Sequence, residues 1–121
     1  MRTRFITIAM VLITTAGCGK ASTTMPSPPP TPSGSTVSIV SGASTLTTTA
    51  YNPNPIAISR GMTVTWMNND TTTHTSTSNS GAWSSGPIAP GGSFSSTFQT
   101  AGTFTYHCTI HPGMVGTVNV Q

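Results

Sequence analysis

The chain has 121 residues, only 4% of them charged, and a formal net charge of +3, so it can form one small domain with accessory segments. Two of its four basic residues, Arg2 and Arg4, stand at the N-terminus, which leaves no basic patch for nucleic-acid phosphates. The single acidic residue, Asp70, allows no pair of catalytic carboxylates and is expected in a turn or at a strand end, so we expect no enzyme.

Residues 1–17 have the features of an export signal. Arg2 and Arg4 form its positive start, and the apolar stretch 5–13 is too short for an ordinary transmembrane helix. Ala16-Gly17-Cys18 resembles the end of a bacterial lipoprotein signal, in which the Cys is lipidated and becomes the new N-terminus. The alternative is an ordinary secretory signal cleaved nearby. We expect an exported protein, periplasmic or on the cell surface, held at the membrane only through Cys18.

Residues 18–35 form a tether rich in Pro, Ser and Thr, with its prolines concentrated between positions 26 and 32. Proline-rich segments extend by about 3.1 Å per residue and act as semi-rigid spacers. We expect an unstructured leader and a tether that lifts a folded domain off the membrane.

From residue 36 to residue 121, apolar side chains alternate with Ser and Thr in the period of two that indicates β-strands. The alternating residues are Val37 and Ile39, Ile56 and Ile58, Met62, Val64 and Trp66, Phe94 and Phe98, Phe104 and Tyr106, and Val118 and Val120. Turn-forming residues separate these runs at 52–55, 68–70, 89–92 and 101–102. The pattern predicts an all-β domain, a β-sandwich of short strands without a helix of normal length.

One short loop places a thiol, an imidazole and a thioether in the order Cys108-x-x-His111-x-x-Met114. These are the soft and borderline ligands that copper prefers. A strand ending at Cys108 would direct its sulfur inward, and the turns that follow would return the other two side chains to the same point. A second imidazole would complete the two-His, one-Cys set with a weak axial Met that is typical of blue-copper sites.

His74 is the candidate for that second imidazole. The chain has three histidines, and because strand side chains alternate faces, His107 should point away from Cys108 and lie at the surface. For Cys108 itself, the alternatives are a small buried apolar residue or a disulfide with Cys18.

Further residues accompany this loop, and they are Asn52-Pro53-Asn54-Pro55-Ile56, Gly61 to Asp70, Ser85-Gly86, Pro90-Gly91, Phe94, Phe98, Gly102 to Tyr106 and Gly116 to Val120. With them, residues 36–121 resemble a small cupredoxin, a blue copper protein of the plastocyanin/amicyanin type. The short loop is more similar to that of amicyanin than to that of plastocyanin. The resemblance implies a Greek-key β-sandwich of the cupredoxin type. It also implies one copper ion, cycling between Cu(I) and Cu(II) and bound by His74, Cys108, His111 and Met114.

The chain departs from this family at two places. An Asn commonly follows the upstream ligand His and ties the two ligand loops together, whereas Thr75 stands here. We therefore expect a weaker or differently made tie. The family also often has an acidic residue near Trp83-Ser84, and this chain has none there.

The function implied by the resemblance is the carriage of single electrons between redox partners outside the cytoplasm. The partners would be proteins that dock transiently near His111 on a monomer, through an apolar face with few charges. Two alternatives remain open: a copper-binding or delivery protein that does not cycle, and a metal-free surface β-sandwich on a proline-rich stalk.

Overall fold

The computed structural model describes Gly19, Pro26 and residues 34–121. The expected export signal and Cys18 lie outside the described residues, as does nearly all of the expected tether. Within the part of the chain that is described, no helix is long and apolar enough to cross a membrane.

Short strands make up nearly all of the regular structure. They are β1 (Gly34–Ile39), β2 (Tyr51–Asn52), β3 (Ile56–Ile58), β4 (Thr63–Asn68), β5 (Thr77–Ser78), β6 (Ser93–Thr97), β7 (Gly102–His107) and β8 (Val115–Val120). A single turn of 3-10 helix, η1 (Ala43–Thr45), lies between β1 and β2.

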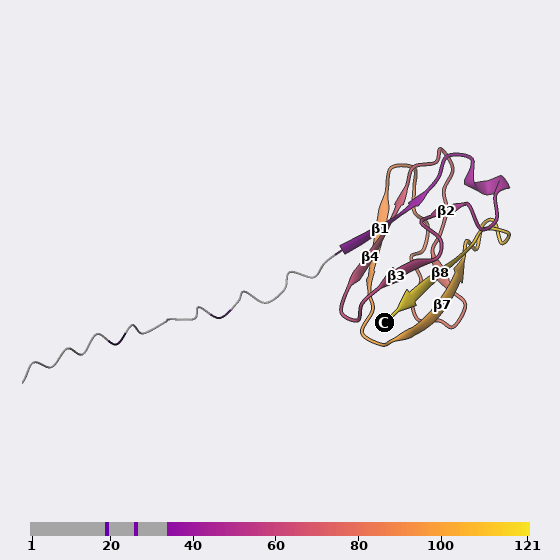
Figure 1. Ribbon diagram of the computed structural model, residues 1–121. Helices are drawn as coiled ribbons and strands as arrows, with labels where there is room; N and C mark the ends of the chain where they lie inside the picture. Colours follow the sequence, from indigo (N-terminus) through magenta and orange to yellow (C-terminus); the bar gives the residue numbers. More distant parts are fainter. Residues whose placement is uncertain (1–18, 20–25, 27–33) are drawn as a thin grey trace, which may run out of the picture.

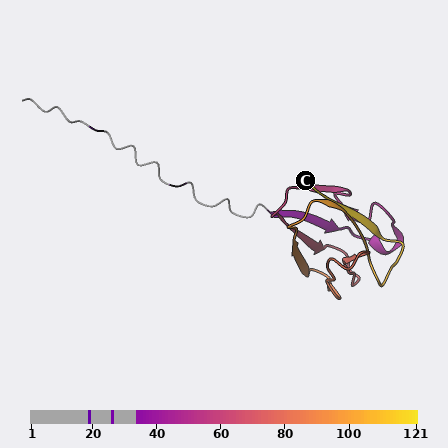
Figure 2. The same ribbon diagram turned by 90° about the horizontal axis from the view of Figure 1, so that it is seen from below.

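The strands form two four-stranded sheets, ordered β2-β1-β4-β6 and β3-β8-β7-β5. Each sheet is mixed, because β1 pairs in parallel with β4 and β3 pairs in parallel with β8, whereas the other pairs are antiparallel. The two sheets face each other as a sandwich (Figure 1), and the same arrangement is seen from below in Figure 2. The predicted all-β sandwich is therefore confirmed.

The core between the sheets is built from the apolar members of the alternating runs. Trp66 on β4 is fully buried at its centre. Its ring stacks on that of Trp83 with centroids 5.5 Å apart, and it meets Tyr106 of the opposite sheet edge-on, also at 5.5 Å. Such aromatic pairs contribute about 0.5–1.5 kcal/mol each beyond the burial of their area. Val37, Val64 and Val118, from both sheets, are fully buried around them.

Two strands were not predicted from the sequence. Both β2 and β5 contain only two residues, which is too short for any alternation to be read. Each is defined instead by its neighbour: β2 pairs with the end of β1, and β5 pairs with the end of β7.

Tyr106 and Gly116 are direct partners in the β7–β8 pair, and the tyrosine ring lies over the glycine. A Cβ atom at position 116 would lie 2.7 Å or less from three atoms of the tyrosine side chain. Because Tyr106 is fully buried in the core cluster, moving its ring would disturb the packing around it. Gly116 is therefore required by the close approach of a side chain.

We predict that Gly116→Ala lowers the free energy of unfolding by about 1–3 kcal/mol, because it forces an overpacked core to rearrange. Urea unfolding of the metal-free protein measures the change. Gly34→Ala is the matched control, since a Cβ there meets nothing nearer than 3.9 Å. Equal stability of the two variants would contradict this account of Gly116.

Candidate metal centre

The Cys108-to-Met114 loop connects β7 to β8, which are paired up to His107 and Val115. Two backbone hydrogen bonds close it: the N–H of Cys108 donates to the carbonyl of Met114 at 3.1 Å, and the N–H of Met114 donates to that of His111 at 2.9 Å. Cys108 and Met114 are thereby held next to each other, and both are fully buried. His111, on the outer turn of the loop, is only partly buried.

His74 reaches the same place from the segment after β4. Its backbone pairs with that of Ile88: the His74 N–H donates to the Ile88 carbonyl at 3.2 Å, and the reverse bond is 2.7 Å. The side chain of His74 is fully buried. The position of this histidine is thus fixed by a bridge between two loops.

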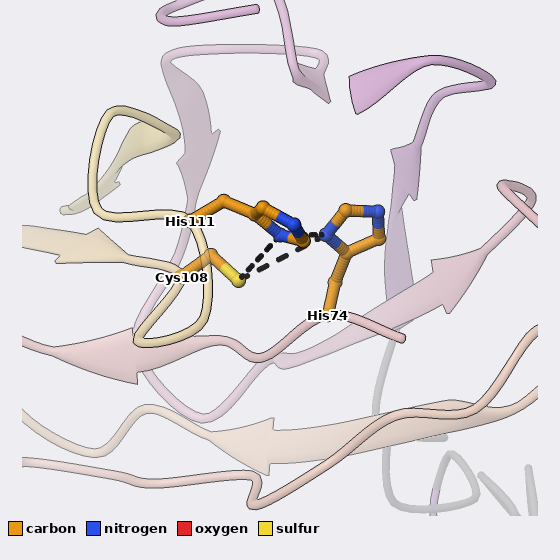
Figure 3. Close-up of side chains that lie close together, drawn as sticks. All are labelled: His74, Cys108 and His111. Atoms are coloured by element: carbon orange, nitrogen blue, oxygen red, sulfur yellow. Dashed lines mark hydrogen bonds between the residues drawn. The ribbon is translucent and has the colours of Figure 1, made fainter. Parts of the chain in front are cut away.

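The side chains of His74, Cys108 and His111 converge on one point (Figure 3). Cys108 Sγ lies 3.8 Å from His74 Nδ1 and 3.9 Å from His111 Nδ1, and the two Nδ1 atoms are 3.2 Å apart. Among residues 34–121, this is the cluster of His, Cys and acidic side chains that is close enough to hold a metal ion.

These separations fit a metal ion bound by all three atoms. Bonds of about 2.0–2.3 Å, as zinc makes to imidazole and thiolate, would keep three ligand atoms in a plane about 3.5–3.7 Å apart. The distance between the two Nδ1 atoms, 3.2 Å, is a little shorter than this range, and the two S···N distances of 3.8 and 3.9 Å are a little longer. The donor set of two imidazoles, one thiol and a nearby thioether is the one that copper prefers, so the site fits one copper ion.

The other sequence candidates are placed as follows. Met114 is fully buried in the same apolar cluster as Cys108, and its backbone carbonyl accepts the hydrogen bond from the Cys108 N–H. His107 lies outside the cluster, and its Nδ1 is bonded to the side-chain oxygen of Asn79 at 2.5 Å. Among the residues that the structure describes, Cys108 is a free thiol. Cys18 lies outside the part of the chain that the structure covers.

Asp70 contacts the site, a role that the sequence analysis missed by expecting only a turn residue. One of its carboxylate oxygens lies 2.8 Å from Nε2 of His74. Hydrogen bonds from His74 and from the backbone N–H groups of Gly42 and Thr71 lower the pKa of Asp70 to about 2. The signal available in the sequence was the only acidic residue of the chain, four positions before a candidate ligand.

Thr75 makes the tie between the two ligand loops. Its hydroxyl accepts a hydrogen bond from the N–H of Thr109 at 2.9 Å, and its own N–H donates to the sulfur of Cys108 at 3.3 Å. Its carbonyl accepts a hydrogen bond from the hydroxyl of Tyr51 at 2.6 Å, and burial raises the pKa of that tyrosine, which keeps it protonated. The tie expected from an Asn is therefore made differently, by a threonine.

Comparison with known proteins gives concordant results. The model for copper binding proteins of the plastocyanin/azurin family matches residues 37–121. A plastocyanin from Scenedesmus fuscus is 39% identical over 84 residues, which cover 59% of this chain and 86% of the plastocyanin.

Similar solved structures include a purple cupredoxin from Nitrosopumilus maritimus, with a TM-score of 0.67 and 32% identity over 72% of this chain and 99% of that one. The Cu(I) form of an amicyanin mutant has a TM-score of 0.62 and 28% identity, covering 73% of this chain and 82% of that one. The resemblance to cupredoxins and the cupredoxin-like sandwich are confirmed.

We predict that Thr75→Val lowers the free energy of unfolding of the metal-free protein by about 1 kcal/mol, because the Thr109 N–H loses its acceptor. Urea unfolding of the two metal-free proteins measures the change in the free energy of unfolding. Thr65→Val is the matched control: its hydroxyl bonds to Ser95 on an exposed sheet face, where water can replace it. If Thr65→Val destabilises the protein as much as Thr75→Val does, the tie contributes nothing specific.

Proposed function

Because the chain belongs to the plastocyanin/azurin family of copper-binding proteins, we propose that it is a mononuclear blue-copper electron carrier. The observation that carries the proposal is the convergence of His74 Nδ1, Cys108 Sγ and His111 Nδ1 within 4.8 Å of one another. Cupredoxin relatives are electron carriers rather than enzymes, and a role in catalysis is not proposed.

Each residue of the site has a distinct part in this proposal. His74 and His111 would supply imidazole nitrogens to the copper ion, Cys108 would supply a thiolate, and Met114 would supply a thioether. Bound copper supplies a centre that takes up and releases one electron. Cys108 and Met114 keep their places because the hydrogen-bonded loop fixes their backbones, and such pre-organisation limits rearrangement as the charge changes.

The proposed port for electrons is the surface around His111. This histidine is partly exposed, and the neighbouring Ile110 and Val115 are 48% and 38% exposed. Arg60 and Asp70 are the only charged residues in 34–121, and Asp70 is buried. An apolar face with little electrostatic steering suits brief encounters with redox proteins, and we propose that the protein works as a monomer.

We also propose that the protein is exported and anchored through a lipid on Cys18, in the periplasm or at the cell surface. The support is the sequence alone: a positive start, a short apolar stretch and the small residues before Cys18. The proline-rich tether would then separate the anchor from the copper domain.

We predict that the copper-loaded protein has an intense visible absorption band that is lost and regained on reduction and reoxidation. Cys108→Ser should abolish the band, because the transition requires sulfur bound to copper. Absorption spectroscopy during copper titration and redox cycling measures both effects.

His107→Asn is the matched control, because His107 lies outside the cluster. The copper-loaded His107→Asn variant should keep its visible band. A band that survives Cys108→Ser would show that Cys108 is not the ligand. A copper-bound protein that cannot be reduced reversibly would favour delivery of copper over electron transfer.

For the anchor, we predict that the unaltered protein partitions into the detergent phase and that Cys18→Ala releases it or blocks its processing. Phase partitioning and mass spectrometry of the N-terminus provide the measurements. A soluble exported protein whose N-terminus is not Cys18 would contradict lipidation.

A further inference from the structure

The only acidic side chain of the chain is buried at the edge of the metal centre. Asp70 is 6% exposed, and its Oδ2 lies 2.8 Å from Nε2 of His74. Removing a carboxylate from water costs free energy unless hydrogen bonds and opposite charges compensate it. The carboxylate is therefore held where it is by specific partners.

The second carboxylate oxygen of Asp70 is fixed as firmly as the first. Oδ1 accepts hydrogen bonds from the N–H of Gly42 at 3.0 Å and from that of Thr71 at 2.8 Å. Gly42 precedes η1, 28 residues before Asp70, so these bonds connect two separate loops.

Asn68 braces the same turn. Its Oδ1 accepts the N–H of Asp70 at 2.9 Å, and its Nδ2 donates to the carbonyls of Thr72 at 2.8 Å and Ile88 at 2.9 Å. Ile88 is also the backbone partner of His74. The carboxylate and the histidine are thus mounted on one rigid unit.

This arrangement determines the tautomer of His74. A carboxylate only accepts hydrogen bonds, so Nε2 of His74 must carry the proton. In the neutral ring, Nδ1 then keeps its lone pair, and that atom faces Cys108 and His111 (Figure 3). His111 has no such partner available to it, because the chain has no second acidic residue.

We propose that Asp70 is a positioning residue of the copper site, which fixes the Nε2–H tautomer of His74 and lowers the reduction potential of the bound metal. The part that concerns copper rests on the proposed function. Hydrogen-bonded carboxylates make a ligand imidazole more basic, and a nearby negative charge favours the more positive oxidation state. Asp70 thus stabilises Cu(II) more than Cu(I).

The first test uses the unaltered, metal-free protein. Nitrogen-15 NMR of the imidazole nitrogens should show His74 as a single tautomer with its proton on Nε2. A proton on Nδ1, or a mixture of the two tautomers, would overturn the proposal. This measurement needs no copper, so it remains decisive even if the protein proves not to carry electrons.

The second test compares Asp70→Asn with Asp70→Glu in the copper-loaded protein. Asp70→Asn removes the charge, so it should weaken Cu(II) binding about 10–100-fold and Cu(I) binding less. Each tenfold by which the loss of Cu(II) affinity exceeds the loss of Cu(I) affinity raises the reduction potential by about 59 mV. Asp70→Glu keeps the charge and should restore much of the original potential. An unchanged potential in a folded Asp70→Asn variant would refute the proposal.

Val120→Ala controls for loss of stability alone. Val120 is 5% exposed and lies five residues along β8 from Val115, roughly 17 Å at the rise of an extended strand. It should destabilise the protein without changing the potential. If Val120→Ala shifts the potential as much as Asp70→Asn does, the effect of Asp70 is structural only and the proposal is wrong.

Discussion

The hydrogen bonds of Thr75 are the constraint on which the metal centre depends. The residue follows His74 directly, and each of its polar groups has a partner: its N–H bonds to the sulfur of Cys108, its hydroxyl to the N–H of Thr109, and its carbonyl to the hydroxyl of Tyr51. Two loops more than 30 residues apart in the sequence are thereby locked together. The imidazole and the sulfur can face each other because their backbones cannot separate.

The rest of the domain is stabilised by packing and hydrogen bonds, with almost no use of charge. Trp66 joins the two sheets through aromatic contacts with Trp83 and Tyr106. The only acidic side chain of the chain, Asp70, lies at the metal centre, where its carboxylate accepts a hydrogen bond from His74. Charge is thus concentrated where it can act on the site, while the surface around it exerts little long-range electrostatic attraction.

This division of roles suits a carrier of single electrons. The β7–β8 loop is short and closed by backbone hydrogen bonds, and His74 is held by a bridge to Ile88. Groups mounted on such rigid elements keep their geometry better than groups on long loops. The partly exposed His111 lies on the outer turn of the loop, where a partner can approach closely.

The sequence by itself determined the local features: strands from the alternation of residues such as Val64 and Trp66, and a candidate ligand loop from the spacing of Cys108, His111 and Met114. Such patterns can be read because they repeat within a few residues. The tertiary structure alone decided the role of Asp70, the tie made by Thr75 and the two-residue strands β2 and β5. They depend on hydrogen bonds between segments 12 to 34 residues apart, such as the bond from Gly42 that fixes Asp70, and contacts of that kind leave no periodicity in the sequence.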